Sequence, residues 1–232
     1  MRELRSPAGA TGWAWGRRDT LGLVLAVVVA AAGVWWWNGA FSLGGPRQGT
    51  PPNVVLVTID TLRADRVGIG LTPFIDRLGA AGVVFTNARA AAPLTLPSHA
   101  SLLTGVRPSI HGARENGVSS LAAGVMTLAE AFRRGGYSTA AFVSAYVLDR
   151  RFGLDRGFDV YDDRVPRRPD APTRLEAERP GTETVAAALA WMESRRQAAA
   201  PSAPYFVWVH LYEPHAPYAP GPAFLARGDG DR

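Results

Sequence analysis

The run Asn53–Asp60 places the strongest constraint on how this chain can fold. It reads Asn-Val-Val-Leu-Val-Thr-Ile-Asp, so aliphatic residues fill it almost continuously and do not alternate with polar ones. Such a run predicts a strand that is buried on both faces, as in a parallel sheet between helices. The similar run Tyr205–Leu211, and a predicted helix Thr127–Arg134 followed by a strand Tyr137–Val143, fit the same arrangement. The sequence therefore predicts an α/β fold around a mostly parallel sheet.

Other segments predict shorter elements of the same domain. A helix is expected from Thr72-Pro73 to about Ala81, since proline suits the first helical turn. Val83–Phe85 predicts a short strand, and Glu183–Ala199 has a helical composition with apolar residues on one face.

The segment Pro93–Gly105 holds the strongest candidate for chemistry. It reads as a loop that feeds a short helix, with Pro97 in the first turn and Gly105 at the exit. Thr95 lies just before that start, in the positive field of a helix N-terminus, where a nucleophile could face an oxyanion. The plainer role for this threonine is an N-terminal cap.

An uncharged apolar segment near the N-terminus predicts a membrane anchor. Residues 20–41 include the charge-free run Leu21–Trp37, and about 20 residues span roughly 30 Å of hydrocarbon. Trp35–Trp37 suits the membrane interface. Arginines in residues 1–19 predict a cytoplasmic tail, a single-pass anchor in the cell membrane and a periplasmic or extracellular domain. A cleaved signal peptide with its small-residue site at Ala30–Ala32 is the alternative.

Composition excludes several kinds of site. The 232 residues include no Cys, which excludes disulfides, thiolate metal sites and a cysteine nucleophile. The net charge of +5 comes from scattered arginines, so we expect no nucleic-acid partner. Residues 42–52 read as a linker rich in Gly and Pro.

Several motifs resemble those of the sulfatase family, in the alkaline-phosphatase superfamily. Thr95–Gly105 resembles the signature Cys/Ser-x-Pro-Ser-Arg followed by Leu-Thr-Gly, and Pro97 and Ser98 match it. Thr95 stands where sulfatases carry the Cys or Ser that is oxidised to formylglycine, and His99 stands where they carry Arg. Threonine nucleophiles occur elsewhere in the superfamily, notably in phosphoethanolamine transferases.

The resemblance extends to the segments that follow two predicted strands, but it does not hold for the segment that follows a third. Sulfatases end their first strand with an Asp-Asp pair that binds a divalent metal; Asp60 matches the first position and Thr61 occupies the second. Pro214–Pro217 is similar to the family's Pro-His-x-Pro segment, whose His contacts the anionic substrate, and His215 matches that His. In place of the family's Gly-Lys-Trp-His segment, this chain has Ser144–Val147.

The resemblance implies a three-layer α/β sandwich and a metal-assisted ester hydrolase. Residues 53–232 would be the N-terminal portion of its catalytic domain, with further metal ligands beyond them. Oxygen ligands favour Ca²⁺ or Mg²⁺ as the divalent metal, with Zn²⁺ or Mn²⁺ as alternatives. No other cofactor is implied. The implied catalytic residues are Thr95, His99 and His215, and the implied metal ligands are Asp60, Thr61 and Thr95.

Three functions remain open from these motifs. The first is a membrane-anchored sulfatase-like hydrolase of sulfate or phosphate esters, whose substrate is a small molecule, a glycan or a lipid. The second is a phosphoryl or phosphoethanolamine transferase, which Thr95 favours. The third is a non-catalytic anchored binding protein on a sulfatase scaffold, favoured by Thr61, His99 and the missing Lys-His pair. Bound metal would distinguish an enzyme from a binding protein.

Overall fold

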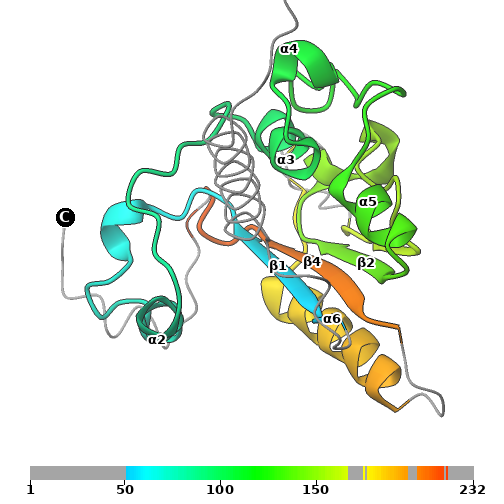
Figure 1. Cartoon of the computed structure of the whole chain (residues 1–232). Helices are drawn as coiled ribbons and strands as arrows, with labels where there is room; N and C mark the ends of the chain where they lie inside the picture. The colour runs from blue at the N-terminus through cyan, green and yellow to red at the C-terminus, as the bar shows by residue number, and fades with distance from the viewer. Residues whose placement is uncertain (1–50, 167–174, 176, 198–202, 217, 219–232) are drawn as a thin grey trace, which may run out of the picture. The chain divides into compact units, whose positions relative to one another are not determined.

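Figure 1 shows the computed structural model of the chain. The structure describes residues 51–166, 175, 177–197, 203–216 and 218. The predicted tail, membrane anchor and most of the linker (residues 1–50) lie outside the described residues. None of the helices in the described part is both long and apolar enough to cross a bilayer.

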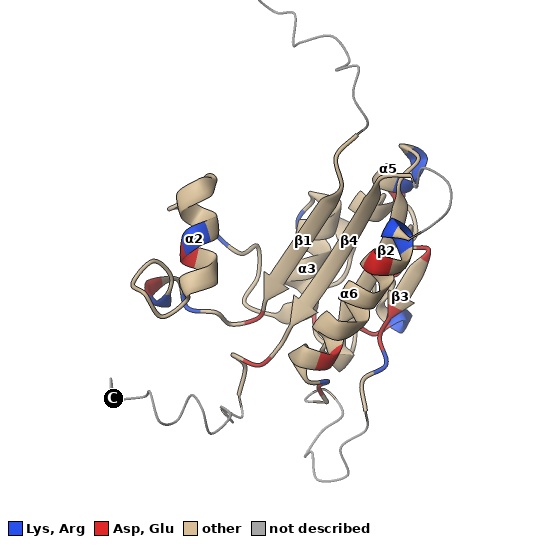
Figure 2. Ribbon diagram, turned by 90° about the horizontal axis from the view of Figure 1, so that it is seen from below, with Lys and Arg blue, Asp and Glu red and all other residues tan. Residues whose placement is uncertain are grey.

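A parallel sheet forms the centre of the described residues. Its four strands lie in the order β1-β4-β2-β3, and each neighbouring pair is parallel, as Figure 2 shows. The predicted α/β fold with a parallel sheet is therefore confirmed. The strands are β1 (Val54–Ile59), β2 (Ser138–Val143), β3 (Val160–Asp162) and β4 (Tyr205–Leu211).

Helices cover both faces of this sheet (Figure 1). The helices α3 (Thr95–Thr104) and α5 (Leu128–Arg134) pack on one face, and α6 (Gly181–Arg196) packs on the other. Side chains alternate along β4, so Phe206 and Trp208 face α3 and α5 while the residues between them face α6. Helix, sheet and helix thus form the three layers that the resemblance implied.

The predicted helices form with small shifts at their ends. The helix expected over Glu183–Ala199 begins two residues earlier, after Pro180, and ends at Arg196. Thr127 caps α5 in a capping box, since its hydroxyl accepts from the Glu130 backbone N–H. Shorter elements complete the order: η1 (Ala64–Arg66), α2 (Pro73–Ala81), α4 (Pro108–His111), η2 (Tyr146–Leu148) and η3 (Arg150–Phe152).

Two expectations about strands are wrong. Val83–Phe85 forms no strand, and its side chains are 65–80% exposed. An extended segment becomes a strand only when its backbone groups pair with a neighbour, and none pairs with this one among the described residues. Burial of β1 on both faces is also wrong here, because β1 is the edge strand and Val55 and Val57 are each 51% exposed.

Gly157 provides a test of the packing between α5 and the turn before β3. Its φ is +87°, and an added Cβ would overlap the backbone nitrogen of Glu130. Gly136 has a similar φ of +83° but open space around it. We expect Gly136→Ala to cost about 1–2 kcal/mol of unfolding free energy from backbone strain alone. Gly157→Ala should cost clearly more in urea denaturation, and equal losses would show that the steric overlap is absent.

Candidate active site

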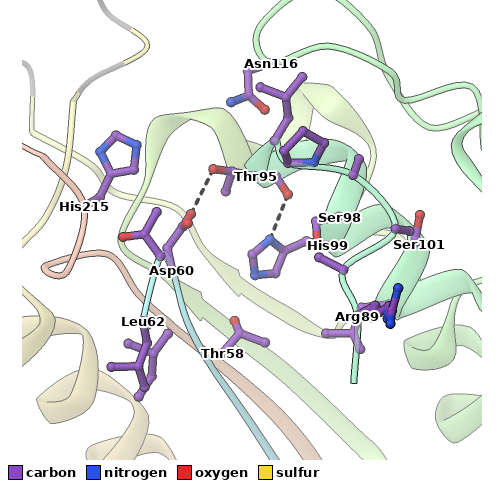
Figure 3. A pocket seen from close by; sticks show the side chains of 18 residues that line it. Thr58, Asp60, Leu62, Arg89, Thr95, Ser98, His99, Ser101, Asn116 and His215 are labelled. Carbon is purple, nitrogen blue, oxygen red and sulfur yellow. Dashed lines mark hydrogen bonds between the residues drawn. The ribbon is translucent and has the colours of Figure 1, made fainter. Parts of the chain in front are cut away.

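The carboxyl ends of β1 and β4 meet the start of α3 at a cavity of about 740 Å³. The cavity is lined by residues 58–62 at the end of β1, by the loop residues 89–94 and by one side of α3. Asn116 and His215 complete the lining, as Figure 3 shows. Ligands gather at this edge of open parallel sheets, because loops there diverge and leave a crevice.

Thr95 and Asp60 meet at the centre of this cavity. The Thr95 hydroxyl donates to Asp60 Oδ2 at 2.8 Å, although the two residues are 35 positions apart in the sequence (Figure 3). Thr95 is the first residue of α3, and Leu94 precedes it as the cap residue without a side-chain cap bond. The expectation that Thr95 only caps the helix is therefore wrong, since its hydroxyl is used across the site.

The backbone N–H groups in the first turn of α3 are largely accounted for within the fold. The Leu96 N–H donates to Asn116 Oδ1 at 2.9 Å, and Pro97 has no N–H to satisfy. At the other end Gly105 adopts φ +70°, the left-handed conformation predicted for the helix exit. Asn116 was not among the predicted site residues, and its Asn-Gly turn gives no local signal of this contact.

Asp60 is the acidic group of the cavity. Partial burial raises its pKa, but the His210 ring and the Thr95 hydroxyl together lower it below the ordinary value of 3.8. Asp60 is therefore an anion at neutral pH. Thr61 follows it with φ +54°, a strained conformation for a β-branched residue and the only positive φ outside glycine in the described residues. This strain turns the chain sharply and places Thr61 in the cavity wall.

His99 lies one helical turn after Thr95 and is 8% exposed. Its Nδ1 donates to the Thr95 carbonyl oxygen at 2.8 Å, which leaves a lone pair on Nε2 because a carbonyl only accepts. Burial, followed by the nearby His210, lowers the pKa of His99 to about 4. His99 is therefore a neutral imidazole at pH 7, and it can accept a proton or orient a group without adding charge.

His215 lies in the segment that follows β4, and it lines the same cavity. It is half-buried and stacks on Tyr212 with ring centroids 4.4 Å apart. The structure thus brings all five predicted site residues to one cavity: Asp60, Thr61, Thr95, His99 and His215.

Residues 52–227 match the sulfatase family. The chain belongs to this family. An arylsulfatase of Clostridium perfringens (strain 13 / Type A) is 35% identical over 107 residues, which cover 43% of this chain and 22% of that protein. Arylsulfatase G of Mus musculus is 31% identical over 150 residues, which cover 60% of this chain and 28% of that protein. The chain spans about a quarter of the length of these curated relatives.

A solved structure shares the fold as well. The phosphonate monoester hydrolase of Agrobacterium radiobacter matches with a TM-score of 0.55 and 26% identity, over 74% of this chain and 43% of that chain. The resemblance drawn from the motifs is therefore confirmed at the level of the sulfatase family.

The sulfatase-family signature departs from its usual residues inside the cavity itself. In the resemblance drawn from the motifs, Thr95 aligns with the Cys or Ser of the signature, and His99 aligns with its Arg. Arg89 lines the same cavity from the loop before α3, and no other Lys or Arg is among the described lining residues. Its Nε–H donates to Asn87 Oδ1 at 3.2 Å.

His210 is a residue of the site that the motifs did not predict. It is fully buried in β4, and its Nε2 lies 3.6 Å from Asp60 Oδ2. The alternation of side chains along β4 would have predicted it. Trp208, His210 and Tyr212 are spaced two residues apart and share the face that packs against α3.

The described part of the cavity fits a divalent cation only in part. Asp60 offers a carboxylate, and Thr61 and Thr95 offer hydroxyl oxygens, which suit a hard cation. Within the described residues, no three His, Cys, Asp or Glu side chains converge as a metal-binding group. The metal set Asp60, Thr61 and Thr95 therefore stays a prediction, and further ligands would come from outside this set.

Removing the Asp60 carboxylate tests this set directly. We expect Asp60→Ala to weaken the binding of Ca²⁺ or Mg²⁺ about tenfold or more, because it removes the one anionic ligand. Isothermal titration of the full-length protein measures the affinity. Asp65→Ala is the control, since Asp65 is exposed and pairs with Arg63 away from the cavity. Equal affinity in Asp60→Ala and the parent protein would contradict the prediction.

Proposed function

We propose that this chain is the N-terminal portion of the catalytic domain of a sulfatase-family hydrolase. Its substrate would be a sulfate or phosphate ester, and Thr95 would be the nucleophile. One observation carries the proposal: the Thr95 hydroxyl is held by an ionised carboxylate, at a helix N-terminus, in the wall of a cavity. That arrangement aligns an oxygen nucleophile and offers backbone dipoles to an anion.

The reaction would begin with the attack of Thr95 Oγ1 on the sulfur or phosphorus of the ester. The hydroxyl proton passes to Asp60 as the new bond forms, and the bond to the leaving alcohol breaks. Among the other residues that line the cavity, His215 would give the alcohol oxygen its proton, and Arg89 would bind the charged ester oxygens. Water then attacks the sulfur or phosphorus of the Thr95 ester, and the bond from Oγ1 to that atom breaks. Asp60 returns its proton to Oγ1, His215 takes a proton from the attacking water, and the sulfate or phosphate anion leaves.

The residues that would hold a divalent cation are Asp60, Thr61 and Thr95. When bound there, such a cation supplies Lewis acidity that favours ionisation of a hydroxyl and stabilises negative charge. Thr95 would be kept aligned by Asp60 with or without it, since their hydrogen bond needs no third group.

A transferase is the second candidate, and the identity of Thr95 favours it. Threonine cannot form the aldehyde of formylglycine, so the intermediate would be an ordinary ester of its hydroxyl. An acceptor alcohol can attack that ester in place of water, and the group is then transferred. Product analysis with and without an added alcohol separates hydrolysis from transfer.

Substitution of Thr95 tests the nucleophile. In the full-length protein, Thr95→Ala should lower the rate on aryl sulfate, aryl phosphate or phosphodiester substrates by about 10³-fold or more. Thr95→Ser keeps the hydroxyl and should retain a measurable rate. Thr104→Ala is the matched control, because that hydroxyl bonds to the Ala100 carbonyl at the far end of α3. Equal rates in Thr95→Ala and the parent protein would remove Thr95 from the mechanism.

We further propose that residues 20–41 anchor the protein in the cell membrane, with the domain outside the cytoplasm. The support is the uncharged apolar run and the arginines that precede it. Deletion of residues 1–41 should move the protein from the membrane to the soluble fraction after carbonate washing. Deletion of residues 1–19 alone is the control and should leave it in the membrane fraction. A parent protein in the soluble fraction would contradict the anchor.

A further inference from the structure

We propose that His210 is a positioning residue, whose Nε2–H donates to Asp60 Oδ2 and holds that carboxylate against the Thr95 hydroxyl. The inference deepens the proposed function and rests on it for the role of Thr95. It concerns a residue that lies outside every motif of the sequence analysis.

The pairing of β1 with β4 brings His210 to Asp60. Thr58 pairs with His210 in the register of the two strands, and Asp60 follows Thr58 by two residues on the same face. The Asp60 backbone N–H donates to the Leu211 carbonyl at 2.9 Å, which continues the ladder past the end of β1. Backbone bonds on both sides therefore hold the two side chains at this spacing.

His210 is buried in a way that calls for a partner. Its exposure is 0%, and neither ring nitrogen has a hydrogen-bond partner among the residues that the structure describes. A buried polar group without a partner costs about 1–3 kcal/mol. His111 shows the ordinary case, since it is equally buried but its nitrogens contact Ser101 Oγ at 2.9 Å and the Ala113 N–H at 3.2 Å.

Asp60 is the charged acceptor beside His210. The rings of His99, Trp208 and Tyr212 lie around it, with centroids 4.9–6.3 Å away. The Asp60 Oδ2 atom lies 3.6 Å from Nε2, so a movement of about half an ångström makes an ordinary N–H···O bond. Oδ2 can accept this second bond, because a carboxylate oxygen has two lone pairs and the Thr95 hydroxyl uses one of them.

Two donors on one oxygen would fix the carboxylate. Thr95 already donates to Oδ2, and His210 faces the same atom. Oδ1 takes part in neither contact. The His210 ring offers this oxygen a single N–H, whereas the guanidinium of an arginine would pair with the whole carboxylate through its fork of donors.

Two substitutions at position 210 and one control at position 209, all in the full-length protein, test the role. His210→Ala removes the donor and should lower kcat by about 10–100-fold with KM nearly unchanged. His210→Gln offers an amide N–H at a similar distance and should recover most of that loss. Val209→Ala is the matched control, because Val209 lies on the same strand but faces α6. It should lower stability and leave kcat unchanged.

A spectroscopic measurement tests the bond without relying on activity. In protein labelled with ¹⁵N-histidine, the His210 Nε2–H should give a downfield proton signal that His210→Gln removes. Asp60→Ala should shift or broaden that signal; if this variant does not fold, Asp60→Asn should shift it upfield, because an amide oxygen is a weaker acceptor.

The outcomes separate this inference from the proposed function. If the His210 Nε2–H signal is the same in both Asp60 variants as in the parent protein, the His210–Asp60 bond is overturned, whatever the substrate of the enzyme. The same holds if His210→Ala keeps the parent kcat, or if His210→Gln is as impaired as His210→Ala. An active Thr95→Ala variant would instead overturn the role of Thr95 as the nucleophile. The bond between His210 and Asp60 would then be judged from the NMR measurement alone.

Discussion

The parallel pairing of β1 with β4 is the constraint on which the rest of this structure depends. It joins segments about 150 residues apart, and a side-chain bond from Trp208 Nε1 to Thr58 Oγ1 at 3.0 Å reinforces it. Because parallel strands end at the same edge of a sheet, the pairing places Asp60 and the segment after β4 at one cavity. Without it the two halves of the site would have no fixed relation.

The second requirement is the approach of α3 to that edge. Leu96, Ala100 and Leu103 are buried against the sheet, so the helix is held by packing along its length. Its first turn then presents Thr95 to Asp60, and Asn116 satisfies the backbone N–H that follows. Packing of the apolar side of the helix thus sets the position of the polar end, where the chemistry would occur.

The electrostatics of the cavity follow from burial. An anionic Asp60 lies beside two imidazoles, and burial keeps His99 neutral at physiological pH. Positive charge reaches the cavity from Arg89 and from the helix N-terminus. This balance differs from the sulfatase signature, in which an arginine stands at the position of His99.

Local pattern determined a large part of this protein. The apolar runs predicted β1, β2 and β4, and proline and glycine marked α2 and the end of α3. The resemblance to sulfatase motifs identified five of the residues that line the cavity: Asp60, Thr61, Thr95, His99 and His215. Tertiary structure alone decided that the Thr95 hydroxyl bonds to Asp60, that one face of β1 is half exposed, and that Val83–Phe85 is not a strand. It also decided that the buried His210 faces the carboxylate. The reason is physical: periodicity and capping depend on neighbours along the chain, whereas the contacts of a side chain across a sheet depend on strand order and register, which no local pattern contains.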